Sequence, residues 1–456
     1  MSRSLWGDGT GSADLVSAYT AGDDRRWDCR LLRWDVLGTM GHVTGLIEAG
    51  LLTAAEGSAL IAELRRTLVA TDSRVLTVTN SDEDAHSALE NHLIDRLGEL
   101  GEKVHTGRSR NDQVMTALRL YLKNAVLGIE ADVVEAAETL LDLGRRYPRV
   151  AMPGFTHLRR AMPSSVALWA AGYAEALLDD LGLLGAVVDL ADRGPLGSAA
   201  GYGVPLPLER QAVSEALGFA APQLAVTAVQ LARGKLEAAV LSALWSVARD
   251  LAALSWDVIL FSAEEHGYIV LPAELATGSS IMPHKRNPDV FELTRGRAAI
   301  VAGLATQAMA VAGSLPGGYH RDMQLVKGPV MEGLDTVGAM VTMMAEAVRQ
   351  LEIDVDRCAA AVAGDLLATD EVYRRVRAGA PFRSAYRELA AELAAGAVVP
   401  SLTVDEVLDA RTHLGGAGAP PLGELTTIAA RARAEIADRR RRFDEALSRL
   451  AGNGHP

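Results

Sequence analysis

The chain has 456 residues and a net charge of −13, and 49% of its residues are hydrophobic, which allows a large core and argues against disorder. Acidic residues outnumber basic ones by 58 to 45. The densest basic run, residues 439–442, lies in a helical stretch with acids beside it, so we interpret it as a solvated helix face and expect no nucleic-acid partner. Cys29 and Cys358 suggest neither a disulfide framework nor a metal site. No signal peptide or run of about 18 apolar residues is evident, so we expect a cytoplasmic protein without a membrane span.

After an irregular start, the first part of the chain is predicted to be helical. Residues 1–22 are rich in Gly and Ser and are expected to lack regular structure. From Arg26 onward, apolar residues recur at steps of three and four, which indicates one face of a helix. A second helix is predicted from Thr53 to Leu68, with Thr53 as its N-cap and Glu56 completing a capping box.

Long proline-free stretches dominate the rest of the chain. They lie before Pro148, at 223–271 and at 330–380. A helix of thirty residues would be about 45 Å long, which does not fit a compact globule, so these stretches predict an elongated bundle. Residues 236–260 are apolar around much of the predicted helix, and we expect partner subunits to cover them.

The predicted fold class is therefore all-α, an elongated bundle of long helices with smaller helical domains at both ends. Aromatic residues make up only 5% of the chain, and Ala and Leu dominate, which favours close-packed helices over sheets. We expect an N-terminal, mostly helical domain at 1–104, a central long-helix bundle at 105–350 and a small helical C-terminal domain at 351–456.

The segment 277–289 has the composition of an active-site loop. Gly278 gives backbone freedom, and Pro283 and Pro288 prevent a continuous helix. The hydroxyls, imidazole, cations and carboxamide between them suit an anion, although a solvated basic turn is the alternative. The pattern Gly-Ser-Ser-x-Met-Pro-x-Lys-x-Asn at 278–287 resembles the signature of the aspartase/fumarase lyase superfamily, whose members release fumarate by cleaving C–N or C–O bonds.

A second polar motif, His-Thr-Gly-Arg-Ser-Arg-Asn-Asp-Gln-Val at 105–114, precedes an apolar periodic segment. Donors at a helix N-terminus form an anion site, whereas the alternative is a capping segment with solvated charges. The whole motif resembles the argininosuccinate lyases. The resemblance implies that Ser109, Arg110 and Asn111 hold the substrate, with Arg110 on a carboxylate, which suits its planar guanidinium.

The segment 153–163 is bracketed by prolines and contains Thr156 and His157. A histidine beside a hydroxyl between helix breakers is placed for hydrogen bonding, although a purely structural histidine is the alternative. The resemblance implies that Thr156 contacts substrate and that His157 transfers a proton or orients a carboxylate. An imidazole suits proton transfer because its ordinary pKa lies near neutrality.

Two further segments carry weaker signals. The acids that precede His86 at 81–84 are too loosely arranged for a metal site and predict a helix start, with His86 at most a supporting residue. The Gly-rich segment 195–203 lacks the Lys-Ser/Thr that would follow in a nucleotide phosphate loop.

The segment 319–327 is the one that indicates the substrate. Tyr319, Gln324 and Lys327 resemble the residues that argininosuccinate lyases direct at the arginine part of their substrate. An exposed polar helix face is the alternative interpretation.

The resemblance also implies a mechanism without a cofactor or metal. Ser279 is the expected base. A serine is a poor base unless its pKa is lowered, so Lys285 and loop N–H groups are expected to favour its alkoxide form. Lys285 and Asn287 are expected to bind the charge that the substrate carboxylate gains. The leaving guanidino group would receive a proton, with His157 as one possible source. The implied assembly is a homotetramer in which each site draws residues from three chains.

The expected function is the release of L-arginine and fumarate from argininosuccinate, the last step of arginine biosynthesis. Three departures from the family leave another N-succinyl adduct open as the substrate. His284 stands where Gln is common, a substrate-contacting serine is replaced within residues 23–25, and a Ser-Asp-Arg-Asp segment is represented only by residues 230–233. A non-enzymatic structural protein of this fold is a further alternative. The resemblance extends to residues 4–7.

Overall fold

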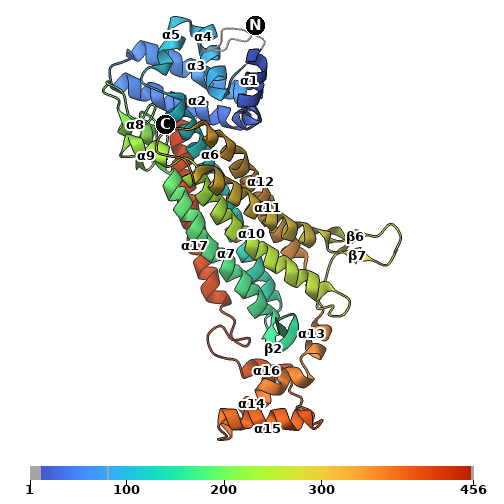
Figure 1. Cartoon of the computed structure of the whole chain (residues 1–456). Coiled ribbons are helices and arrows are strands. Elements are labelled where there is room, and N and C mark those ends of the chain that lie inside the picture. The colour runs from blue at the N-terminus through green and yellow to red at the C-terminus, as the bar shows by residue number, and fades with distance from the viewer. Residues whose placement is uncertain (1–11, 80–81, 453–456) are drawn as a thin grey trace.

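The computed structural model describes residues 12–79 and 82–452, so the resemblance at 4–7 and residue 81 of the segment before His86 lie outside it. Six long helices within these residues run side by side as an elongated bundle (Figure 1). They are α6 (Arg110–Arg146), α7 (Val166–Ala191), α10 (Lys235–Ser262), α11 (Asp289–Ala312), α12 (Lys327–Gln350) and α17 (Leu422–Ala451). With 37 residues, α6 is about 55 Å long, and the predicted all-α, elongated fold is confirmed.

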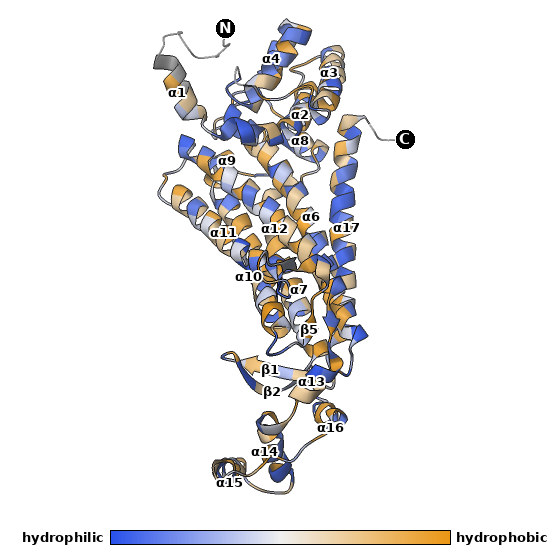
Figure 2. Ribbon diagram, turned by 90° about the vertical axis from the view of Figure 1, so that its right-hand side faces the viewer, coloured by the Kyte–Doolittle hydropathy of each residue, from blue (hydrophilic) through white to orange (hydrophobic). Residues whose placement is uncertain are grey.

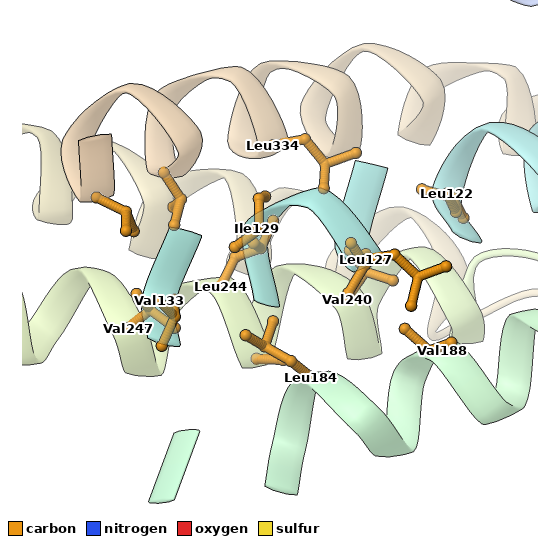
Figure 3. Close-up of a cluster of buried hydrophobic side chains, with 14 of the residues drawn as sticks. Leu122, Leu127, Ile129, Val133, Leu184, Val188, Val240, Leu244, Val247 and Leu334 are labelled. Atoms are coloured by element: carbon orange, nitrogen blue, oxygen red, sulfur yellow. The ribbon is translucent and has the colours of Figure 1, made fainter. Parts of the chain in front are cut away.

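The bundle core is a continuous layer of aliphatic side chains. Figure 3 shows leucine, isoleucine and valine side chains of α6, α7, α10 and α12 meeting between the helices. Leu122 and Val133 of α6 and Leu244 of α10 have no exposed surface. Because these residues recur at helical spacing, each helix contributes one apolar stripe to a shared interior.

A second helical unit covers one end of the bundle (Figure 1). It consists of α1 (Ser12–Ala21), α2 (Asp24–Glu48), α3 (Ala54–Asp72), α4 (Ala85–Leu97), α5 (Glu99–Glu102) and the 3₁₀ turn η1 (Lys103–His105), with α8 (Arg210–Ala216) and α9 (Val226–Leu231) nearby. The helix expected from Arg26 is α2. The capping box of α3 is present, because the Thr53 N–H donates to Glu56 over 2.9 Å and the Glu56 N–H to the Thr53 hydroxyl over 3.3 Å.

One prediction in this unit was wrong. Residues 12–21 were expected to be irregular, yet they form α1, which ends before Gly22 with a φ of +49°. The prediction used the Gly- and Ser-rich composition of residues 1–22 as a whole. It therefore overlooked a short stretch within them whose Ala and Leu residues favour a helix.

The opposite end of the bundle carries small elements. They are the hairpin β1 (Ala151–Thr156) and β2 (Arg159–Ser165), the pair β5 (Ile269–Val270) and β8 (Glu352–Ile353), and the helices α13 (Val355–Ala361), η4 (Gly364–Leu367), α14 (Ala368–Arg377), α15 (Phe382–Ala394) and α16 (Val404–Asp409). A short parallel pair, β3 (Arg193–Gly194) and β4 (Ala221–Pro222), lies nearer the other end. After α16 the chain returns, and α17 packs along α6, so the last helix lies with the bundle in space although 351–456 was predicted as one domain.

By length and composition, α10 is the one helix in the described part of the chain that is apolar enough to cross a membrane. It packs against α7, α11 and α12 inside the bundle, and 50% of its most apolar window is buried there. A core helix of a bundle has this same composition, so packing inside the bundle accounts for the buried half of this apolar window.

Candidate active site

A cavity of about 580 Å³ lies between the N-terminal unit and the adjoining end of the bundle. Its walls come from α2, α4, the start of α6, the turn before α10, and the segment that contains η3 (Arg321–Val326). Six residues expected to bind substrate line it: Ser109, Arg110, Asn111, Tyr319, Gln324 and Lys327. Segments more than 200 positions apart in the sequence therefore line the same cavity.

The motif at 105–114 forms the N-terminus of α6, as predicted. Ser109 is the N-cap: its hydroxyl accepts the Asn111 N–H over 3.3 Å, and its own N–H donates to Asp112 Oδ1 over 3.0 Å. Asp112 Oδ2 accepts the N–H groups of Gly197 and Ala199 at 2.9 and 2.7 Å. The buried carboxylate thus fixes the Gly-rich segment against α6. Burial raises the pKa of Asp112 to about 6 although these N–H groups favour its charged form.

Arg110 enters the cavity from the first turn of α6. Its Nη1 lies 3.0 Å from Glu83 Oε1, and its Nη2 is paired with Asp84. Burial lowers the pKa of Arg110, but Asp84 and Glu83 raise it by more, so the net shift is upward. Asp84 also caps α4 by accepting the Ser87 N–H over 2.8 Å, which confirms the helix start predicted there.

Buried polar side chains also line the cavity. Arg108 donates to the Thr39 hydroxyl over 2.8 Å, and burial lowers its pKa. His86 Nδ1 lies 2.9 Å from Asp35 Oδ2. Burial lowers the pKa of His86 and Asp35 raises it more, so the net shift is upward. His86 therefore lines the cavity and is paired there with a buried carboxylate of the protein.

Lys327 lies at the other side of the cavity, at the start of α12. Its Nζ is 2.5 Å from Asp28 Oδ1 and 2.6 Å from Asp24 Oδ1. Burial lowers the pKa of Lys327, and the two carboxylates raise it more. Two carboxylates share one ammonium, so this wall carries excess negative charge. Gln324 Nε2 donates to the Thr20 carbonyl over 2.9 Å.

Several cavity residues were not predicted from the sequence, among them Asp24, Asp28, Arg233 and Arg321. Asp24 and Asp28 are spaced four residues apart and so share a face of α2, a signal that the sequence does contain. Arg233 lies with its Cζ 4.9 Å from the centre of the Tyr319 ring, a contact across the fold that no sequence spacing indicates.

The expected catalytic loop lies elsewhere in the chain. The strands β6 (Thr277–Gly278) and β7 (Arg286–Asn287) pair antiparallel, and the loop between them projects from the bundle (Figure 1). Ser279 lies at its start, where its Oγ accepts the N–H groups of Ile281 and Met282 at 3.3 and 3.1 Å. Lys285 is exposed and Asn287 is half-buried.

Thr156 and His157 lie at the tip of the β1–β2 hairpin, at the end of the bundle away from the cavity (Figure 1). His157 and Leu158 form a two-residue turn with φ values of +54° and +58°, the left-handed conformation that such hairpin turns require. Both side chains are exposed. A pair of non-Gly residues in this conformation is uncommon.

Within one chain, the expected site residues therefore fall into three separate groups. The cavity holds six of them, the β6–β7 loop holds Ser279, Lys285 and Asn287, and the β1–β2 hairpin holds Thr156 and His157 (Figure 1). The chain alone brings together the residues of each group but not the three groups.

Comparison with known proteins identifies the family. A family model described as lyase matches residues 21–303. The chain is 44% identical over 425 residues to an argininosuccinate lyase of Sorangium cellulosum, covering 93% of this chain and 98% of the relative. An argininosuccinate lyase of Thermotoga neapolitana is 40% identical and covers 86% of this chain and 98% of the relative.

Solved structures support the fold. An EDDS lyase bound to formate superimposes with a TM-score of 0.82 at 21% identity, covering 96% of this chain and 94% of that one. The class II fumarase of Schistosoma mansoni gives a TM-score of 0.71 at 17% identity, covering 91% and 94%. From the matched family model and the near-complete alignment at 40–44% identity, the chain belongs to the lyase family and, within it, to the argininosuccinate lyases.

Proposed function

We propose that the protein cleaves argininosuccinate into L-arginine and fumarate, the last step of arginine biosynthesis, in the cytoplasm. The cavity carries the proposal. One wall holds arginines, with Arg110 at the N-terminus of α6, and the other holds Asp24 and Asp28 around Lys327. Argininosuccinate has carboxylates at one end and a cationic amino acid at the other, so a cavity with both signs of charge suits it.

The proposed chemistry is an elimination. A base removes a proton from the carbon beside a succinyl carboxylate, the C–N bond breaks, and the electron pair leaves with the guanidino nitrogen, which takes up a proton. Ser279 is the proposed base. Its Oγ already accepts two loop N–H groups, which favour the alkoxide, and the nearby Lys285 cation would add to this. Lys285 and Asn287 then bind the developing carboxylate charge.

His157 is the proposed donor of the proton to the leaving guanidino group, or else it orients a substrate carboxylate. The hairpin turn leaves the His157 side chain exposed to solvent, where it could contact a substrate bound by another subunit. Thr156, beside it, is the proposed substrate contact from the same hairpin.

We propose further that the protein is a homotetramer whose sites combine the three groups from three chains. The bundle surface supports this. Large apolar side chains are exposed along the bundle helices: Leu183, Leu190, Trp245, Trp256, Leu293, Ile300, Met309 and Ile428. Figure 2 shows hydrophobic residues recurring along α10 and α11. Exposed apolar surface of this extent is typical of a subunit interface.

The test is direct. Purified protein is incubated with argininosuccinate, and fumarate is followed by its absorbance while arginine is measured separately. The proposal expects both products in equal amounts. Fumarate from adenylosuccinate or another N-succinyl adduct, but not from argininosuccinate, would refute the proposed substrate. It would support the alternative left open by His284, residues 23–25 and residues 230–233. If no such adduct is turned over, the proposal that the protein is an enzyme is refuted.

A further inference from the structure

We propose that Asp24 is a specificity-determining residue that binds the α-ammonium group of the arginine part of the substrate. The inference rests on the proposed function, because it specifies how the same cavity selects the amine that is released. The substrate-contacting serine of the family is replaced within residues 23–25. Of these three residues, Asp24 is the one that lines the active-site cavity.

The backbone holds Asp24 at the edge of the cavity. It is the first residue of α2, and Asp28 follows one turn later on the same face. Gln324 Nε2 donates to the carbonyls of Thr20 and Ala21 over 2.9 and 3.2 Å, so the end of α1 is tied to the cavity wall just before Asp24. The Asp24 side chain is 13% exposed. It is therefore fixed in place and can still be reached from the cavity.

The charge of Asp24 is left in excess by its neighbours. Lys327 is the one cation within ion-pair distance of Asp24 among residues 12–79 and 82–452, with its Nζ 2.6 Å from Asp24 Oδ1. The same Nζ lies 2.5 Å from Asp28 Oδ1. Asp28 Oδ2 also accepts the Ala85 N–H over 3.2 Å. Asp28 alone therefore balances the ammonium of Lys327, and Asp24 adds a further negative charge.

This second carboxylate is not compensated within the described part of the chain. Burial raises the pKa of Asp24, Lys327 lowers it, and Asp28 and Asp84 raise it again, so the net shift is upward. A carboxylate withdrawn from water is stabilised only when a partner offsets its charge. A ligand that carries a cationic group supplies such a partner when it binds beside Asp24.

The charges of the cavity orient the substrate so that its arginine part meets Asp24. The succinyl carboxylates suit Arg110 at the N-terminus of α6, and the other end of the molecule then lies toward Asp24 and Lys327. A second cavity of about 690 Å³ adjoins the first, and Asp24, Arg321 and Gln324 line both. There is thus room beside Asp24 for the amino-acid end of the arginine part, whose ammonium group is a compact cation and a hydrogen-bond donor.

The first test uses Asp24→Asn, which keeps the shape of the side chain and removes its charge. The α-ammonium is not altered when the C–N bond breaks, so contacts to it act equally on the ground state and the transition state. We therefore expect KM for argininosuccinate to rise about 10–100-fold, the scale of a hydrogen bond between charged groups, with kcat within about twofold. An unchanged KM would overturn the proposal.

Two substrate analogues show which group Asp24 binds. The deamino analogue of argininosuccinate lacks the α-ammonium, and the decarboxy analogue lacks the α-carboxylate of the arginine part. Wild type should use the deamino analogue about 10–100-fold less well than argininosuccinate in kcat/KM, and Asp24→Asn should lose most of this preference. The decarboxy analogue should suffer from Asp24→Asn as much as argininosuccinate does. Equal losses with argininosuccinate and the deamino analogue would overturn the proposal.

Asp192→Asn is the matched control. Asp192 Oδ1 lies 2.5 Å from the Nζ of Lys123, whose side chain is 5% exposed, as that of Lys327 is, but this pair lines a different cavity. The substitution should change neither KM nor the preference between the two substrates. Urea unfolding of Asp24→Asn should give nearly the wild-type free energy, because Asp28 still balances Lys327. A large loss of stability with unchanged substrate preference would show a structural role and overturn the proposal.

Binding of the product L-arginine separates this proposal from the proposed function. By calorimetry, wild type should bind L-arginine about 10–100-fold more tightly than its deamino analogue, and Asp24→Asn should not. Should Asp24→Asn not assemble, Asp24→Ser removes the same charge and carries the same test. Wild type that releases fumarate from argininosuccinate without this preference would overturn the role of Asp24 alone. Wild type that releases no fumarate yet shows the preference would refute the proposed function alone.

Discussion

The cavity and the β6–β7 loop differ in how much of their structure one chain supplies. In the cavity, the charged groups are already in place: Lys327 is held between two aspartates, and Arg110 is held by Glu83 and Asp84. In the loop, Lys285 is exposed, and Ser279 Oγ accepts two N–H groups of its own turn. The binding half of the proposed site is therefore built by one chain, and the reactive half is presented outward. Ordered binding groups and a reactive loop that completes the site on closure are a recurrent combination in enzymes.

The largest expected effect is on the reactive half. Ser279→Ala removes the proposed base, and fumarate release should fall about 10²–10⁴-fold because a general base contributes on that scale. Since Ser279 Oγ accepts the N–H groups of Ile281 and Met282 in its own turn, the thermal unfolding temperature should stay nearly unchanged. Ser280→Ala, the neighbouring hydroxyl, is the control and should have a far smaller effect. Near-normal turnover in Ser279→Ala would show that another group is the base.

The binding half should respond in stability. Lys327→Met leaves Asp24 and Asp28 buried without their cation and is expected to lower the free energy of unfolding by about 3–5 kcal/mol in urea. Lys103→Met is the matched control, because Lys103 lies 2.5 Å from Glu56 in an exposed pair, with its side chain 51% exposed. Its loss should be under about 1 kcal/mol. Equal losses in the two variants would mean that the cluster at Lys327 is not a buried ion network.

The binding half also predicts a pH dependence. His42 donates to the Thr106 carbonyl over 3.0 Å beneath the 105–114 motif, and burial lowers its pKa to about 3. Below pH 6.5 the unfolded chain binds a proton that the folded chain refuses, so stability falls as the pH falls. His42 should account for a loss of about 2 kcal/mol between pH 7 and pH 5.

The variant His42→Gln keeps a donor and cannot be charged. Its urea unfolding curves should therefore lose less stability than wild type over this pH range. An unchanged slope of stability against pH would show that His42 is not held neutral.

The smallest effect concerns the hairpin that carries His157. Leu158 has a φ of +58° and is 72% exposed, so Leu158→Gly removes backbone strain at little cost in packing. The free energy of unfolding should rise by about 0.5–1 kcal/mol, because a left-handed residue is strained unless it is Gly. A loss of stability would mean that the Leu158 side chain packs against another subunit.

The helices could be predicted from the sequence because apolar periodicity and capping residues, which are local features of the chain, determine where they form. The apolar period predicted α2, and Thr53 with Glu56 predicted the start of α3. The β1–β2 hairpin was not predicted, because its turn is His157-Leu158 and lacks the Asn-Gly or Gly pair that normally marks one.

The candidate site divides in the same way. Motifs such as 105–114 carry their residues in sequence order, and six of the expected binding residues do meet in the cavity. Arg233 was missed because its place in the site depends on burial and on its contact with Tyr319, which no spacing along the chain encodes. In the proposed homotetramer, Ser279 and His157 reach this cavity from other copies of the chain.

The central claim is that a site takes its binding groups and its base from different chains. Co-expression of Ser279→Ala and Arg110→Ala in equal amounts tests it, since each variant alone should be inactive. If the groups come from different chains, mixed assemblies regain about a quarter of wild-type fumarate release, because random mixing leaves both residues intact at that fraction of sites. Mixed assemblies with no more activity than either variant alone would contradict the account, since one chain would then supply both residues.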